Sequence, residues 1–215
     1  HVQAVVPHGV DVARFQTPIK TVDVPWAQYQ RVIGIVGRIR PEKGTDLFVQ
    51  ALCEQLPQHQ QACAIIVGRA TPQYRSFLAD LQADLKKAGI EDRVFFVNEV
   101  AYADMPGVYQ AMDIVCAPAR YEGYGLVPIE AMCSGTAVVA SRTGAYPDMI
   151  SDGSNGFLTD VGDVSALSSA LGRLLGDDAL LAQQKAAGLA TVAERFSIER
   201  EVEGISAVYE ALWRL

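Results

Sequence analysis

Residues 32–56 read VIGIVGRIRPEKGTDLFVQALCEQL, and this stretch holds a strand, a charged loop and a helix in succession. Val32–Val36 is an apolar run without polar alternation, which is typical of a strand covered on both faces. From Thr45 to Leu56 the apolar residues recur at helical spacing and form one stripe. A buried strand followed by an amphipathic helix is the unit from which parallel sheets are built.

The same alternation continues along the rest of the chain. Further strands are expected at Val2–Val6, Ala64–Val67, Val94–Val97, Ile114–Ala117, Ala137–Ala140 and Phe157–Thr159. Further helices are expected at Pro72–Ala88, Asp104–Ala111, Val127–Cys133, Val164–Leu175, Ala179–Glu194 and after Ser197, which caps the last one. Repeated strand–helix units with right-handed crossovers predict an α/β fold: a doubly wound, mostly parallel Rossmann-like sheet with helices on both faces.

Length and charge limit the classes of protein to consider. The 215 residues are 50% hydrophobic and 20% charged, which predicts one globular domain over residues 1–215. The helical last third is expected to cover the sheet or to dock on a neighbour instead of forming a second domain. The net charge of −7 argues against a nucleic-acid partner, because binding a nucleic-acid backbone requires a positive stripe.

Targeting signals and metal-binding spacings are both missing from the sequence. No apolar run reaches the ~18 residues of a membrane-spanning helix, and the opening HVQAVVPHGV is no signal peptide and resembles a cut within a longer chain. Cys53, Cys63, Cys116 and Cys133 are too far apart for a zinc or dithiol motif. We therefore expect reduced, buried thiols and a cytoplasmic location.

The loop after Val32–Val36 carries an unusual concentration of positive charge. Arg38, Arg40 and Lys43 lie between Gly37 and Gly44, just before a helix begins. Cations beside a helix N-terminus favour an anion, and phosphate is the obvious one. The alternative is a solvated basic loop, and Arg40 in particular is expected to be solvated. The loop fits neither a Walker A motif nor a dinucleotide fingerprint.

A second loop, after Ile114–Ala117, combines acidic residues with a glycine-rich turn. Glu122 comes first, Gly123–Leu126 forms the turn, and Glu130 follows one turn into the next helix. A carboxylate at Glu130 suits the paired hydroxyls of a ribose, and Glu122 can meet a polar group nearer the reacting centre. A glycosidase pair is the alternative, but a hydrolase would not need the phosphate-type loop.

The Glu122 to Glu130 spacing fits the Glu-x7-Glu signature of retaining glycosyltransferases of family 4, which have two Rossmann-like domains in the GT-B architecture. The resemblance is collinear over nearly the whole chain. It rests on Pro7–Asp11, Phe15, Gly37-Arg38, Lys43-Gly44, Glu122–Leu126, Glu130–Met132, Gly135–Ala140, Gly153, Gly156–Leu158 and Phe196-Ser197 with the helix up to Tyr209. Gly44–Val49, Gly68–Pro72 and Gly144–Tyr146 are most similar to bacterial mannosyltransferases of the lipopolysaccharide core, which use GDP-mannose.

The resemblance implies a role for each matching residue. Arg38 and Lys43 match the pair that holds the donor diphosphate. Glu122 matches the catalytic glutamate near the transferred sugar. Glu130 matches the ribose-binding glutamate, and Val100 falls where the base is held. The four residues of the turn, Gly123, Tyr124, Gly125 and Leu126, match the segment whose amides meet sugar hydroxyls and phosphate.

The resemblance also implies partners and a mechanism. It covers only the donor-binding half of such enzymes, so we expect a missing N-terminal domain that binds a glycan or glycolipid acceptor and carries any peripheral contact with the inner membrane. The helix near 197–215 is expected to pack toward that domain, and the isolated half is expected to be inactive. No metal or other cofactor is expected, because cations would meet the charge on the leaving diphosphate.

Several positions depart from the family pattern. Tyr124 replaces the more usual Phe, and His8 stands where Asn is common. Ala145 and Asp148 replace a Gly and a Glu, which puts the role of their loop in doubt. Three alternatives stay open: a UDP-sugar donor, a nucleotide-binding module without activity, and an epimerase or phosphorylase on a similar architecture. The intact Glu122 to Glu130 signature favours the transferase.

Overall fold

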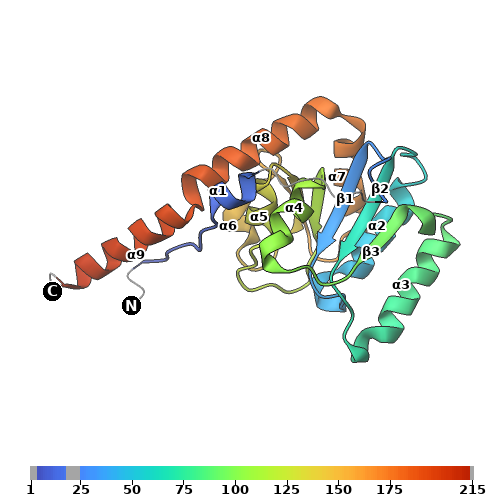
Figure 1. Cartoon of the computed structure of the whole chain (residues 1–215), viewed down its shortest axis with the longest axis horizontal. Coiled ribbons are helices and arrows are strands. Elements are labelled where there is room, and N and C mark those ends of the chain that lie inside the picture. Colours follow the sequence, from blue (N-terminus) through green and yellow to red (C-terminus); the bar gives the residue numbers. More distant parts are fainter. Residues whose placement is uncertain (1–3, 18–24, 214–215) are drawn as a thin grey trace.

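The computed structural model describes residues 4–17 and 25–213, and Figure 1 shows a sheet with helices on both sides. The sheet has six parallel strands in the order β3-β2-β1-β4-β5-β6. Their bounds are β1 Arg31–Val36, β2 Ala62–Val67, β3 Val94–Val97, β4 Ile114–Ala117, β5 Ala137–Ser141 and β6 Phe157–Thr159. This confirms the predicted doubly wound Rossmann-like sheet. The order of strands reverses between β1 and β4, which lie side by side.

Two apolar layers hold the helices against the sheet. The first lies under α2 Thr45–Gln55, α3 Arg75–Lys87 and α7 Val164–Gly176. The second lies under α4 Met105–Gln110, α5 Val127–Cys133 and two short helices that the sequence did not predict, α1 Val12–Gln16 and α6 Tyr146–Met149. The helix α8 Asp178–Arg195 contributes to both layers. Because both faces are covered, the strands are mostly apolar, as the sequence indicated.

The predicted strand at Val2–Val6 is wrong in its described part. Ala4–Val6 form no strand, Val5 is 85% exposed, and Val2 and Gln3 lie outside the described residues. Val6 packs against a helix instead of a strand, because its side chain fills the space beside Gly204 of α9. Within the described residues 4–17, Val10 forms an isolated bridge with Ser197.

The last helix, α9 Ile198–Trp213, projects away from the body of the domain, and the N-terminal segment runs beside its first half (Figure 1). Six of its apolar positions are exposed, from 41% at Ile205 to 91% at Trp213. That this face packs on a preceding domain stays a prediction.

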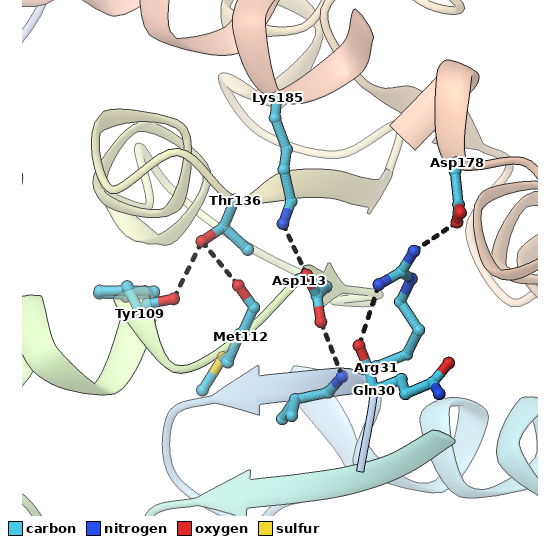
Figure 2. A network of polar contacts seen from close by, with 9 residues as sticks. Gln30, Arg31, Tyr109, Met112, Asp113, Thr136, Asp178 and Lys185 are labelled. Atoms are coloured by element: carbon cyan, nitrogen blue, oxygen red, sulfur yellow. Dashed lines mark hydrogen bonds and ion pairs between the residues drawn. The ribbon is translucent and has the colours of Figure 1, made fainter. Parts of the chain in front are cut away.

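A polar network fixes the amino ends of the central strands, opposite the carboxyl ends where a ligand would bind (Figure 2). Asp113, just before β4, accepts a hydrogen bond from the Val32 amide at 3.0 Å and one from Lys185 Nζ of α8 at 2.7 Å. The Thr136 hydroxyl donates to the carbonyl of Tyr109 at 2.9 Å. These contacts join β1, β4 and α8 through side chains that are about three-quarters buried, with Asp113 23% and Lys185 27% exposed.

Asp113→Ala is expected to lower the free energy of unfolding by about 2 kcal/mol, because it leaves an amide and an ammonium group without their partner. Asp113→Asn should cost about half as much, since the amide oxygen can still accept from Val32. Urea unfolding at constant m-value measures both. Equal losses in the two variants would contradict this account of the network.

Candidate functional site

The two loops that the sequence singled out follow β1 and β4, the neighbours between which the strand order reverses. Ligands of open α/β sheets bind beyond the carboxyl ends of the strands at this point. Residues 37–44 and 118–126 therefore meet at the place where the fold itself predicts a binding site. Their separation in the sequence is large, and only the sheet order brings them together.

Glycine at position 44 allows the two loops to touch. Gly44 has φ +70°, and a Cβ at this position would lie 1.9 Å from the carbonyl oxygen of Pro118. Across the same contact the Arg120 amide donates to the Glu42 carbonyl at 2.9 Å. The Arg120 guanidinium also donates two hydrogen bonds to the carboxylate of Asp46, of 2.7 and 2.6 Å. The loops thus form one rigid unit, and sequence reasoning did not find the part played by Arg120.

Lys43 and Glu122 form an ion pair across the junction of the two loops. Both side chains are largely buried, with Lys43 22% and Glu122 15% exposed. The other carboxylate oxygen of Glu122 accepts from the amide of Gly123 at 3.2 Å. Lys43, one of the two residues predicted to hold the diphosphate, thus contacts Glu122, the predicted catalytic glutamate.

A buried tyrosine completes the surroundings of Glu122. The Tyr146 hydroxyl, from α6, lies 3.4 Å from Glu122 Oε2, and its ring is 2% exposed. Burial, and then the nearby carboxylate, raise the pKa of Tyr146, so the phenol stays protonated and can donate. Nothing in the sequence indicates a contact between Tyr146 and Glu122, because Tyr146 occupies an ordinary apolar position of a short helix.

Glu130 is buried in α5 and faces a different partner. Only 7% of Glu130 is exposed, and its carboxylate accepts a 2.7 Å hydrogen bond from the hydroxyl of Tyr109. Burial raises the pKa of Glu130, and the hydrogen bond from Tyr109 offsets part of that rise. A buried carboxylate with one protein donor keeps lone pairs for a ligand.

The glycine-rich turn is tied to both ends of the chain through two of the departures from the family pattern. The hydroxyl of Tyr124 donates to the carbonyl of His8 at 3.1 Å, and the two rings meet edge to face at 4.9 Å. His8 Nδ1 in turn lies 2.9 Å from Glu201 of α9, which also accepts from the Gly9 amide at 2.8 Å. The added hydroxyl and the unusual histidine therefore belong to one contact.

The family model described as glycosyl transferases group 1 matches residues 19–191. The chain belongs to the group 1 glycosyl transferases. The matched span runs from before β1 to within α8, so it contains both loops of the candidate site.

Similar proteins include two mannosyltransferases of lipopolysaccharide core biosynthesis. LpsB from Rhizobium meliloti is 38% identical over 98% of this chain, and LpcC from Rhizobium leguminosarum is 40% identical over 97%. The alignments cover 61% and 59% of those proteins, so this group 1 glycosyl transferase chain spans less than two thirds of their length.

Solved structures of the group share the fold. The C-terminal domain of LpcC from Francisella tularensis matches with a TM-score of 0.82 at 32% identity, over 88% of this chain and all of that one. HepE from Anabaena in complex with UDP matches with a TM-score of 0.86 at 26% identity, over 97% of this chain and 57% of that one.

The other predicted site residues of this group 1 glycosyl transferase differ in their exposure and contacts. Arg38 is exposed, and no hydrogen bond or ion pair joins it to another described residue. Val100 follows β3 and packs on the same layer as Tyr109. Gly123 and Leu126 are exposed, whereas Tyr124 and Gly125 are partly covered.

Two further observations bear on ligands and membranes. Among residues 4–17 and 25–213, no group of three or more His, Cys, Asp or Glu residues is arranged to hold a metal ion. Within the same ranges, no helix has the length and apolar character needed to cross a membrane.

Proposed function

We propose that this chain is the donor-binding domain of a retaining hexosyltransferase that transfers mannose from GDP-mannose to a lipopolysaccharide core or another glycan or glycolipid acceptor. The observation that carries the proposal is the Lys43–Glu122 pair, which joins a phosphate-type loop to the Glu122–Glu130 segment at the strand-order reversal. The names of LpsB and LpcC support mannose as the sugar.

In this proposal, contacts with the bound donor replace contacts that the side chains make within the protein. Lys43 leaves Glu122 and joins Arg38 on the diphosphate, where it stabilises the charge that develops as the nucleotide departs. Glu122 is then free to face the transferred sugar. Glu130 accepts from the ribose hydroxyls, and Val100 packs against the base.

Retention requires the acceptor hydroxyl to attack from the face that the nucleotide leaves. The proton of that hydroxyl then passes to an oxygen of the departing phosphate, which lies on the same face. Lys43 and Arg38 stabilise the negative charge on that phosphate, and the proposal therefore includes no metal ion or other cofactor. The acceptor, a preceding domain that binds it, and peripheral attachment to the inner membrane through that domain are parts of the same proposal.

A UDP-sugar donor is the second candidate. HepE, which matches this chain with TM-scores of 0.83–0.86, was solved with UDP and with UDP-glucose. Both donors share the diphosphate and ribose, so Arg38, Lys43 and Glu130 serve either one. Only the base and the sugar distinguish the two candidates.

GDP is expected to protect the full chain against thermal unfolding, by about 2.7 kcal/mol at one hundred times its dissociation constant. Glu130→Gln should weaken GDP binding about tenfold or more, because it removes a charged acceptor for the ribose. Glu91→Gln, at an exposed position far from the site, is the matched control. Stronger protection by UDP would replace mannose with the second candidate, and no protection by either nucleotide would contradict both.

Glu130→Gln should also stabilise the protein in the absence of nucleotide. Since the pKa of Glu130 is raised on folding, the folded chain holds this proton more tightly than the unfolded chain does. Stability therefore falls as the pH rises from the ordinary value of 4.5 through the raised folded value, and the loss persists at neutral pH. Glu130→Gln removes this loss, so Tm at pH 7 should rise while the GDP-dependent shift shrinks.

A further inference from the structure

A cavity of about 270 Å³ opens between the loops that follow β1 and β2. It is lined by Arg38, Ile39, Arg40, Thr71, Gln73 and Tyr74. Lys43, Glu122 and Glu130 do not line it, so it borders the proposed donor site without coinciding with it. Pockets for drug-sized ligands usually measure ~300–1,000 Å³, and this cavity therefore suits one sugar or one charged group, not a second nucleotide.

The charge of the lining is positive in a chain of net charge −7. Arg38 has no partner among the described residues. The expectation that Arg40 is solvated is wrong: its side chain is 28% exposed and its Nε is buried without a hydrogen bond. The nearest carboxylate is Glu42 at 3.8 Å, which also lies 3.4 Å from the Tyr74 hydroxyl. Glu42 Oε2 is also buried without a hydrogen bond. Counting this carboxylate against the guanidinium groups of Arg38 and Arg40 leaves one net positive charge at the cavity.

An unsatisfied hydroxyl lines the same cavity. Thr71 Oγ1 is buried and has no hydrogen-bond partner among the described residues. Buried polar groups in proteins are nearly always hydrogen-bonded, so such a group calls for a physical explanation. A hydroxyl and two guanidinium groups are donors that an anionic oxygen would satisfy.

The protein backbone holds the cavity open. The Ile39 amide donates to the Arg69 carbonyl at 3.1 Å, which joins the two loops. On one side the turn Pro72–Tyr74 is closed by a 2.8 Å hydrogen bond from the Tyr74 amide to Thr71. On the other side Arg40 precedes the turn Pro41–Lys43. A ligand would therefore enter a site that is already formed.

The cavity borders the apolar layer opposite the one that holds the residues assigned to the nucleoside, because its lining residue Ile39 belongs to that layer. Val100 and Tyr109, the partner of Glu130, belong to the layer of α4 and α5. Ala70, next to Thr71, and Phe77 of α3 belong to the other layer. A donor whose nucleoside lies near Val100 and Glu130 occupies Arg38 with its diphosphate but leaves the part of the cavity lined by Arg40 and Thr71 free.

We propose that this cavity binds an anionic group, a phosphate or a carboxylate, carried by the carbohydrate that accepts the sugar. Arg40 and Thr71 are its defining residues, with Arg38 shared between the cavity and the donor diphosphate. The identity of the ligand as the acceptor rests on the proposed function, whereas the anion site itself does not.

In the test, the full chain is first saturated with GDP. It is then titrated separately with glucose 6-phosphate, glucuronate, inorganic phosphate and uncharged glucose. NMR follows the amide resonances of residues 38–40 and 71–74. The charged sugars are expected to shift these resonances and glucose is not. If glucose 6-phosphate binds more tightly than glucuronate, the anion is a phosphate, and if glucuronate binds more tightly, it is a carboxylate. Arg40→Gln and Thr71→Val should each weaken the charged sugar at least fivefold and leave GDP affinity unchanged.

Arg75→Gln is the matched control, because Arg75 is exposed, lies at the start of α3 and does not line the cavity. Equal weakening by Arg75→Gln and Arg40→Gln would overturn the site in favour of general charge attraction. If the charged sugars bind the chain without GDP but not the GDP-saturated chain, the cavity and the donor site are one site, and this would overturn the proposal. Binding of the charged sugars in a chain that fails to bind GDP or UDP would reject the proposed function and keep the anion site.

Discussion

Glu122→Gln is expected to lower the rate of sugar transfer about 10³-fold while nucleotide binding survives. Glu122 is the carboxylate that lies at the meeting point of the two loops, held by Lys43 and by the Gly123 amide. A glutamine keeps the size of the side chain but cannot supply negative charge next to the transferred sugar. Loss of one preorganised electrostatic contact in an active site typically costs ~10²–10³ in rate.

The rate is measured with GDP-mannose in a protein in which this chain is joined to an acceptor-binding half. Glu99→Gln serves as the control, since Glu99 is 62% exposed and pairs with Arg69. The proposed mechanism predicts a loss in kcat with little change in the GDP dissociation constant. A kcat within threefold of the starting protein would remove Glu122 from the chemistry.

Gly44→Ala is expected to destabilise the domain by about 3 kcal/mol or more and to abolish protection by GDP. The added methyl group meets the Pro118 carbonyl, which belongs to the backbone and cannot rotate away. The loop of Lys43 must then separate from the loop of Glu122. Because the two loops form the proposed site together, stability and binding should be lost together.

Gly89→Ala isolates the contribution of backbone conformation. Gly89 has φ +67°, close to the +70° of Gly44, but a Cβ there would meet nothing within 4 Å. This variant should lose about 1 kcal/mol, the cost of the left-handed conformation, and keep full protection by GDP. If both variants lose the same free energy, the contact between Gly44 and Pro118 has no effect of its own.

The sequence predicted the sheet well because its strands are buried on both faces. Six apolar runs matched β1 to β6 within two residues at either end. The seventh, Val2–Val6, has the same composition, but its described residues lie along α9. Composition records that a segment avoids water and does not record whether a strand or a helix covers it.

The site was predictable where its residues lie in loops with charge and glycine, as around Lys43 and Glu122. Tyr146 and Tyr109 were missed because each is an aromatic residue on an apolar helix face, and its hydroxyl finds a carboxylate only in the folded chain. The link between Tyr124 and His8 was missed for a related reason. The sequence shows each of the two residues as a departure from the family pattern, but they are 116 positions apart, and only the fold brings them into contact.

Because α9 projects from the domain, the two tryptophans lie in different surroundings and contribute differently to fluorescence. Trp26 packs against the ring of Phe95 on β3, with centroids 5.7 Å apart, whereas Trp213 near the tip of α9 is 91% exposed. Unfolding changes the surroundings of the first indole and barely alters those of the second. Tryptophan fluorescence therefore follows the edge of the sheet at β3 and is nearly blind to the helix, while circular dichroism records both. If the distal turns of α9, which no described residue covers, melt before the sheet does, the two signals will report different midpoints.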